Sequence, residues 1–364
     1  MSDITIRKVT YRELKKKPIE VKDDRYGIAA FYTESVRQTF LACPGNREES
    51  DCALLLLLDD DIVIGREIWF GIRLKIGDKI LWVHAGCCLM VCEEYRKVGA
   101  GIELMTANIY KDDSVSFSAF YTPMRVKLFK KQKRAIFEIP EFIKLNNTRF
   151  LFESLLGVKG CVLKLFTVLG NVALRVMEIP NMIKRKKLLM KYVVKKESTV
   201  PDWAGEMAIN DGHKYMEYHD TKWLQWNLDY NLNQYPEDIQ SFYSIFDKKG
   251  LPVGFFMIKE RLERVAGRYK NVIRGTIVEW ATSDKNLLTE ADINLLALSF
   301  FSRHTSHITS ISDNDITIVK LKQMGFRKHG TFQMNFRDKT GEYADGANMA
   351  NWRIRYGCSN SIIY

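Results

Sequence analysis

The stretch "VCEEYRKVGAGIELM", residues 91–105, decides how the chain is interpreted. It follows an apolar run that predicts a strand, and it leads into an apolar run with the spacing of a helix. Gly99 and Gly101 lie at the junction, with Arg96 and Lys97 just before them. The first amides of a helix lack partners within the helix and carry the positive end of its dipole. Because glycine has no Cβ, these amides can approach a phosphate closely, so the stretch predicts a pyrophosphate site.

The same junction also has a purely structural interpretation. Gly99 would cap the helix, and Gly101 would let the helix pack closely against its neighbours. No Gly-Lys-Ser/Thr sequence follows, so the junction is not a P-loop, and three successive strands precede it, unlike in a Rossmann unit. The surrounding elements therefore decide between the two interpretations.

The N-terminal part of the chain alternates between strand and helix patterns. Residues 4–10 predict a strand and residues 24–40 a helix, and three apolar runs joined by tight turns then predict a meander. A helix from about Gly99 to Tyr110 follows, and after it a strand, a basic helix and a last strand near residues 134–143. The predicted order is β-α-β-β-β-α-β-α-β.

Changes of pattern divide the chain into three parts. Residues 1–146 form the first α/β unit, residues 147–199 turn helical and end in a basic run, and residues 200–364 repeat the order of elements of the first unit. In the last part, Thr289 and Asp292 have the spacing of a capping box before a helix, where the first unit has its glycine segment. We interpret the middle part as a helical connector that packs between two α/β (α+β) units.

The stretch from Val91 to Met105 resembles motif A of the GNAT (Gcn5-related N-acetyltransferase) superfamily, in which Arg/Gln-x-x-Gly-x-Gly/Ala follows the fourth strand. Arg96, Gly99 and Gly101 fill this pattern, and the order of elements agrees with it. The resemblance implies two GNAT-like domains, each with a mixed, mostly antiparallel central sheet flanked by helices. Only the first domain has motif A, so the layout is similar to tandem GNAT proteins with one active site.

In that family, motif A binds acetyl-CoA. The amides of the loop would bind the pyrophosphate, and the main chain of the fourth strand would pair with pantetheine where the fourth and fifth strands separate. The resemblance assigns the following residues to cofactor binding: Leu89, Met90, Val91, Arg96, Lys97, Val98, Gly99, Ala100 and Gly101. With acetyl-CoA as the donor, the acyl group would pass directly to an amine.

The groups that move protons follow less directly from the resemblance. The family commonly has a tyrosine as the acid on the helix after the fifth strand, but Phe129 fills that position, and Tyr121 is the nearest substitute. A glutamate base is expected at about Ala85, and His84 is the titratable residue beside it. A structural role is the more common one for such a tyrosine or histidine. A base acting through water, a base from the second domain, and the C-terminal carboxylate of Tyr364 stay open as alternatives.

Composition limits the other functions. The net charge of +11 comes from two basic runs, residues 125–134 and 184–196, and the rest of the chain is nearly neutral, which disfavours a nucleic-acid-binding protein. The seven cysteines include no CxxC pair, which indicates a reducing cytoplasm and no metal site. Because Lys164 and Arg175 interrupt the most apolar stretch, we predict neither a signal peptide nor a membrane span.

These observations favour an acetyl-CoA-dependent N-acyltransferase of the cytoplasm, whose acceptor is a primary amine on a small molecule or a peptide. Two other classes stay open. The protein would be a CoA-binding sensor or scaffold without transfer if the departures at the acid and base positions abolish catalysis. It would be a nucleic-acid-binding protein if the two basic runs formed its interface. The sequence predicts neither the acceptor nor the oligomeric state.

Overall fold

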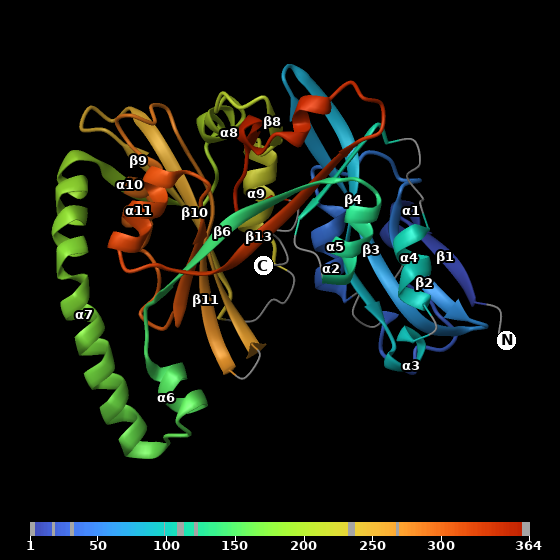
Figure 1. Cartoon of the computed structure of the whole chain (residues 1–364), viewed down its shortest axis with the longest axis horizontal. Helices are drawn as coiled ribbons and strands as arrows, with labels where there is room; N and C mark the ends of the chain where they lie inside the picture. Colours follow the sequence, from blue (N-terminus) through green and yellow to red (C-terminus); the bar gives the residue numbers. More distant parts are fainter. Residues whose placement is uncertain are drawn as a thin grey trace.

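Strands and helices alternate through the first part of the chain as the sequence predicts (Figure 1). A computed structural model describes residues 4–16, 19–29, 33–97, 99–107, 113–119, 123–231, 237–266 and 269–358. The elements of the first part are β1 (Ile4–Thr10), α1 (Tyr11–Lys16), α2 (Glu34–Leu41), β2 (Cys52–Asp59), β3 (Ile62–Ile76), β4 (Lys79–Val91), α3 (Glu93–Arg96), α4 (Ala100–Thr106), β5 (Val115–Ala119), α5 (Pro123–Lys131) and β6 (Ala135–Leu145). The predicted order holds, with the short helices α1 and α3 added to it.

The first predicted helix is shorter than expected. α2 begins after Thr33, whose hydroxyl accepts a hydrogen bond from the amide of Val36. Residues 24–29 form turns and bends instead, and Gly27 has a left-handed φ of 65°. The helical spacing of apolar residues in the sequence therefore covers an irregular segment in addition to α2, which is why the predicted helix was too long.

The second part begins with helices and then builds a further set of strands. Its elements are α6 (Arg149–Leu155), α7 (Gly160–Lys191), β7 (Val193–Glu197), α8 (Asp202–Ile209), β8 (Tyr215–Glu217), α9 (Thr221–Asp229), β9 (Ile239–Phe246), β10 (Pro252–Ala266), β11 (Tyr269–Thr282), α10 (Glu290–Ala297), β12 (His307–Ile311), α11 (Asp315–Gln323), β13 (Arg327–Asp338), the 3₁₀ helices η2 (Ala344–Ala347) and η3 (Met349–Asn351), and β14 (Trp352–Arg353). Thr289 and Asp292 form the predicted capping box of α10. We expected the long helix to pack between the two units, but α7 lies along the outer side of the second part (Figure 1).

Two sheets form the frame of the molecule. In the first sheet the strands follow the order β1-β2-β3-β8-β14, and β4 also pairs with β3. In the second sheet the order is β5-β13-β6-β12-β11-β10-β9-β7. Among the described strands, β11 pairs with β12 and β8 with β14 in parallel, and the other ladders are antiparallel. The predicted fold class, two mixed and mostly antiparallel sheets flanked by helices, is confirmed.

β6 and β13 cross between the two halves of the molecule (Figure 1). β13 pairs with β5 of the first part through Met334–Asp338 and with β6 through Arg327–Phe336. β6 in turn pairs with β12 of the second part. β8 also joins the first sheet, beside the end of β3. Each half is therefore completed by strands of the other, an exchange that the division at residues 146 and 200 did not anticipate.

The exchanged strands meet at a buried tryptophan. Trp352 of β14 is 2% exposed, and its ring stacks on Tyr215 of β8 and on Phe117 of β5, with ring centroids 5.1 and 5.5 Å apart. Phe336 of β13 contacts Trp352 edge to face, and Phe137 of β6 contacts it at a tilt. One indole therefore packs against strands from both parts of the chain, and aromatic pairs add to the stability that burial provides.

We expect Trp352→Ala to lower the free energy of unfolding by about 3–5 kcal/mol, because it leaves a large cavity where both sheets meet. Urea unfolding followed by circular dichroism measures this change. The exposed Ile316→Ala on α11 is the control and should change the free energy of unfolding by less than about 0.5 kcal/mol. A Trp352→Ala protein as stable as the control would contradict the central role of this residue.

Candidate active site

The glycine segment forms a tight turn between two helices. α3 ends at Arg96 and α4 begins at Ala100, so a short helix that the sequence did not predict precedes Gly99. Gly99 caps α4 with a φ of 85°, a left-handed conformation that other residues rarely adopt. In the described part of the chain, only Val91 Cγ2, at 3.6 Å, lies within 4 Å of a Cβ built on Gly101. No side chain therefore projects from Gly99 or Gly101, both half-buried, on either side of the buried Ala100 at the start of α4.

Arg96 and Lys97, the two basic residues before Gly99, are arranged differently. The Nε of Arg96 donates a hydrogen bond to the main-chain oxygen of Val91 at 2.9 Å, so this guanidinium lies against the end of β4. Lys97 is exposed, as are Glu93 and Glu94. Arg96 is thus fixed beside the turn, whereas Lys97 is free to extend toward solvent or an anion.

β4 contains a bulge just before the glycine segment. Its register with β3 shifts between Cys87 and Met90, where β4 has one residue more than β3. Within the bulge, Cys88 has a φ of 52°, a conformation that is uncommon for a residue other than glycine. Bulges redirect main-chain groups and occur often beside active sites. The bulge adjoins Leu89–Val91, the segment predicted to pair with pantetheine.

β4 and β5 lie next to each other but belong to different sheets. Among the described strands, β4 forms a ladder with β3 and β5 forms one with β13. The main-chain nitrogen of His84 on β4 donates a hydrogen bond to the Asp113 carboxylate, at 3.2 Å, just before β5 begins. The separation of these two strands agrees with the fold that the resemblance implies.

His84 is held between two carboxylates. Its Nδ1 lies 3.3 Å from Asp113 Oδ2, and its Nε2 lies 3.5 Å from Asp51 Oδ2. The side chain of His84 is 10% exposed. A general base needs a ring nitrogen within reach of the substrate, and here both nitrogens face acids. This geometry favours the structural interpretation of His84 that a lone histidine in a strand suggests.

The predicted tyrosine acid falls on a segment that the structure does not describe. Tyr121 lies outside the described residues, as do Val98 and the C-terminal Tyr364. Phe129, at the position where the family has its tyrosine, is 5% exposed, and the guanidinium of Arg134 lies 4.4 Å from the centre of its ring. Phe129 is therefore a packed aromatic residue with no proton to donate.

A carboxylate that the sequence did not assign to the site lies against β4. Glu67, on β3, is completely buried. A Cβ built on Gly86 of β4 would lie 2.7 Å from Glu67 Oε1, so the missing side chain at Gly86 makes room for the carboxylate. An acid is thus present beside Ala85, where a glutamate base was expected, although the neighbouring strand supplies it. The signal in the sequence was one acid within the apolar run of β3.

The corresponding helix of the second part is capped by its own side chains. α10 follows β11 as α4 follows β4. The Thr289 hydroxyl accepts a hydrogen bond from the amide of Asp292, and the Asp292 carboxylate accepts one from the amide of Thr289. These bonds occupy amides that a bound anion would need. The capping box thus agrees with the expectation of a single cofactor loop.

A buried ion-pair network lies between β8, β11 and β14. The Glu279 carboxylate contacts His219 Nδ1 through one oxygen and accepts a hydrogen bond from Arg353 Nη2, at 2.6 Å, through the other. His219 Nε2 is 3.4 Å from Glu217 Oε1. Glu217, His219 and Cys358 also place possible metal-ligand atoms within 4.8 Å of one another. The ion pairs account for the charges of this group, and the absence of a metal stays a prediction.

This network should make the free energy of unfolding depend on pH in the acidic range. Burial alone would raise the pKa of Glu279, but Arg353 and His219 outweigh it and lower the pKa from 4.5 to about 2. A carboxylate whose pKa is depressed on folding stabilises the protein above its unfolded pKa and loses that contribution as pH falls through the folded pKa. The stabilisation by Glu279 should therefore be complete above pH 4.5 and disappear toward about pH 2.

We expect Glu279→Gln to lower the free energy of unfolding by about 3 kcal/mol at neutral pH, because it leaves buried cations unpaired. This deficit should shrink as pH falls from 4.5 toward about 2. Urea unfolding at several pH values measures both effects, with the exposed Glu206→Gln as the control. A deficit that stays constant with pH would contradict this assignment.

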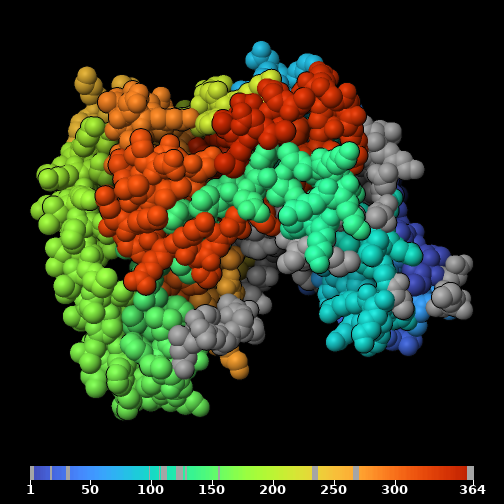
Figure 2. Space-filling view, viewed as in Figure 1, coloured from blue at the N-terminus to red at the C-terminus, as the bar shows by residue number. Residues whose placement is uncertain are grey.

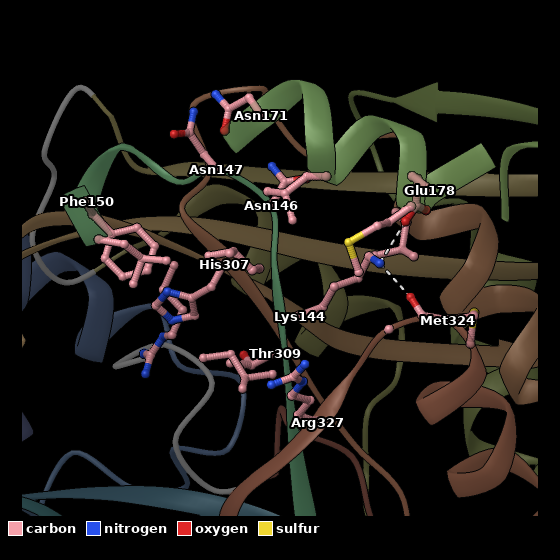
Figure 3. Close-up of a pocket in the computed structure, with 18 of the residues that line it drawn as sticks. Lys144, Asn146, Asn147, Phe150, Asn171, Glu178, His307, Thr309, Met324 and Arg327 are labelled. Atoms are coloured by element: carbon pink, nitrogen blue, oxygen red, sulfur yellow. Dashed lines mark hydrogen bonds and ion pairs between the residues drawn. The ribbon is translucent and has the colours of Figure 1, made fainter. Parts of the chain in front are cut away.

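A cavity of about 1110 Å³ lies in the second part, bounded by α7, α6 and the second sheet (Figure 3). Lys144 and Glu178 point toward one another in its wall, with 2.7 Å between Nζ and Oε2, and Lys144 also donates to the main-chain oxygen of Met324. Six Lys and Arg residues and three Glu residues line the cavity. None of the described residues from β4 to α4 does. No pattern in the sequence predicted this cavity.

Comparisons with known proteins identify the fold. No protein-family model matches the chain, and no curated protein sequence matches it. The Saccharomyces cerevisiae N-myristoyltransferase with bound myristoyl-CoA aligns with 93% of this chain and 79% of its own, at 10% identity and a TM-score of 0.58. A GCN5-related N-acetyltransferase from Anabaena variabilis aligns with 96% of this chain and 74% of its own, at 10% identity and a TM-score of 0.51. A probable N-acyltransferase from Enterococcus faecalis V583 aligns with 92% of this chain and 73% of its own, at 12% identity and a TM-score of 0.51.

The chain therefore has the fold of the GNAT superfamily, as the resemblance implied. At 10–12% identity, the likeness extends to the fold and not to the substrates of these proteins. All three structural neighbours are described as transferases of acyl groups, the one from Enterococcus faecalis as a probable one. The function of this chain has to be argued from its own site.

Proposed function

We propose that the chain is an acyl-CoA-dependent N-acyltransferase with a single donor site along β4 and the start of α4. One observation carries the proposal: the bulge at Cys88 and the left-handed cap at Gly99 lie about one strand end and one turn apart along the chain, and the bulged strand β4 lies beside β5, which belongs to the other sheet. Together they offer main-chain groups to an extended, amide-containing arm and then to a diphosphate. A structural neighbour with bound myristoyl-CoA supports a CoA-linked donor.

Each part of the donor has a counterpart in the site. The main chain of Leu89–Val91 would pair with the amides of pantetheine, as one strand pairs with another. The amides of Ala100 and Gly101 would bind the pyrophosphate, because a helix begins there without a capping side chain. Arg96 and Lys97 would add positive charge beside it. Acetyl-CoA is the donor that we propose for this site.

The transfer itself needs few side chains. The amine nitrogen attacks the carbonyl carbon of the thioester, the new C–N bond forms, and the C–S bond then breaks. The nitrogen loses a proton to a base, and the CoA sulfur leaves as a thiolate that takes up a proton. Holding the amine against the thioester supplies much of the acceleration, and main-chain donors stabilise the oxyanion.

Glu67 is the group that we propose as the base, acting through a water molecule because its side chain is buried. It lies against β4 at Gly86, close to the bulge, and its burial keeps a carboxylate in a site of low polarity. The ring nitrogens of His84 already face Asp51 and Asp113. The acceptor would be a primary amine on a small molecule or a peptide, and the second part would shape its pocket.

A second function, CoA binding without transfer, is favoured by one observation. Phe129 is packed at the position where the family has its tyrosine acid, so the leaving thiolate has no donor there. The chain would then act as a sensor or scaffold that holds CoA. Measurements of binding and of thiol release separate the two functions.

We expect acetyl-CoA to bind the full chain in isothermal titration calorimetry, and Gly101→Val to weaken this binding at least about tenfold. The valine side chain would hold the pyrophosphate away from the amides, and one lost charge-assisted hydrogen bond accounts for a change of this size. The surroundings of Gly101 leave space for a side chain, so the variant should fold. Val319→Ala, exposed on α11, is the control. Unchanged affinity in Gly101→Val would exclude this donor site.

Thiol release from acetyl-CoA in the presence of a panel of amines tests catalysis. We expect Glu67→Gln to lower kcat about 100-fold while the affinity for CoA stays unchanged, because removing a general base slows the chemical step. Loss of both kcat and thermal stability would indicate a structural role for Glu67. Tight CoA binding by the wild-type chain with no thiol release for any amine would favour the sensor.

A further inference from the structure

The long helix α7 has its polar side turned toward the protein and its apolar side turned outward. The residues on its inner face include Thr167, Asn171, Glu178, Asn181 and Arg185, which are buried or half-buried. The outer face carries exposed, mostly large apolar side chains: Val162, Leu165, Val168, Leu169, Val172, Val176, Ile179, Met182 and Ile183. A helix on the surface of a globular protein has the opposite arrangement. The outer face of α7 therefore requires a binding partner that removes its apolar side chains from water.

Polar contacts fix this orientation of α7. The Asn171 side chain accepts a hydrogen bond from the hydroxyl of Thr148, at 2.9 Å. Glu178 forms an ion pair with Lys144, and Asn181 donates to the main-chain oxygen of Met324 at 3.2 Å. These contacts are spread along the helix, and rotating the apolar face inward would break all of them. The apolar face is thus outward because the contacts of the polar face hold it there.

The exposed apolar face is large. α7 forms one whole side of the molecule (Figure 2). It is the one helix in the described part of the chain that is long and apolar enough to cross a membrane, with a mean hydropathy of 1.5 in its most apolar window and 6% of that window buried. Val176, for example, is 59% exposed. Continuous apolar surface of this extent marks an interaction site.

The charges on α7 identify the kind of surface that it fits. The helix has seven Lys and Arg residues and one acid, Glu178, which faces inward to Lys144. Four of the basic residues form the run 184–187 beyond the apolar stretch, and Lys191 follows. Lys184, Lys186, Lys187 and Lys191 are exposed, whereas Arg185 turns inward to Glu178 and Arg175 lines the cavity behind the helix. An anionic lipid surface complements both properties at once, because acyl chains cover apolar side chains and phosphate groups attract lysine and arginine.

We propose that α7 binds the surface of an anionic phospholipid bilayer and lies in the plane of the membrane. Its 32 residues give a length of about 48 Å. Apolar side chains enter the layer of acyl chains, and the basic residues contact headgroups. The inference is independent of the proposed acyl transfer. It keeps the prediction that no segment spans a membrane, but it adds a membrane partner, which we did not expect from the sequence.

Two other covers fit the structure less well. A helix that crossed the membrane would have to leave Thr148, Lys144 and Met324, because these residues belong to the folded body of the protein. A second copy of the chain would cover the apolar side chains but would offer no acid of α7 to the exposed Lys184, Lys186 and Lys187, because Glu178, the one acid of the helix, already pairs with Lys144. The in-plane arrangement keeps every inner contact and brings phosphate groups to these lysines.

Flotation of the purified full chain with phospholipid vesicles tests the proposal. We expect binding to vesicles of phosphatidylcholine mixed with phosphatidylglycerol, and much weaker binding to phosphatidylcholine alone. The double variant Leu169→Glu/Val176→Glu should lower the partition coefficient at least about 100-fold, because two apolar side chains no longer enter the bilayer. Lys186→Glu/Lys187→Glu should lower it about 30-fold or more on the mixed vesicles, since each lysine near an anionic surface adds about 1 kcal/mol.

Matched substitutions away from α7 serve as controls. Leu251→Glu/Ile316→Glu replaces two equally exposed apolar residues, and Lys248→Glu/Lys249→Glu replaces two exposed lysines. Both controls should bind vesicles as the wild type does, and thermal unfolding should show that all variants are folded.

Three results would overturn the proposal. The first is a wild-type chain that does not float with any vesicle. The second is a stable oligomer in light scattering that Leu169→Glu/Val176→Glu dissociates, since a second copy would then cover α7. The third is membrane attachment that survives washing with alkaline carbonate, which would mean that the helix spans the bilayer.

Discussion

The exchange of β6 and β13 is the constraint on which the rest of the structure depends. β13 lies between β5 and β6, so one strand from the end of the chain joins the edge of the first part to the sheet of the second. Trp352 fills the junction from β14. β5 pairs with β13 through one edge, and its other edge, which lies beside β4, forms no ladder with β4 in the described part of the chain, so the bulge at Cys88 lies where two sheets meet without pairing. The proposed donor site is thus a product of how the two halves are joined.

The sequence predicts the elements well and their partners poorly. Residues 52–91 alternate and turn in a way that only a meander satisfies, and the capping box at Thr289 is a local pattern of four residues. These signals can be recognised in a single stretch of sequence, because the spacing of apolar side chains and the residues of a turn are set within a few neighbouring positions. The pairing of β6 with β12 joins residues more than 150 positions apart, and the sequence of neither strand contains a signal that identifies its partner. The same lack of local information explains why α7 was expected between the units, since its periodicity reveals two faces but not which of them turns inward.

The residues of the candidate site also differ in whether the sequence could predict them. Gly99 and Gly101 could be recognised because a left-handed cap and an open first turn require glycine. The bulge at Cys88 could not, because cysteine seldom adopts a positive φ and carries no sequence signal for it. Glu67 could not be assigned either, as its relation to the site depends on the register between β3 and Gly86. His84 was the visible titratable group, and its two carboxylate neighbours come from segments distant in sequence.

The order in which a ribosome makes this chain gives the exchange a further consequence. β5 emerges early, but its partner β13 follows after more than two hundred residues, as the 217 positions between Ser118 and Asn335 show. At an elongation rate of roughly 5–20 residues per second, the open edge of the nascent first half waits for about 10 to 40 s. During this interval the apolar outer face of α7 is already outside the exit tunnel as well. Early capture of that helix by a lipid surface, or a chaperone that shields β5, would keep half-made chains from associating with one another.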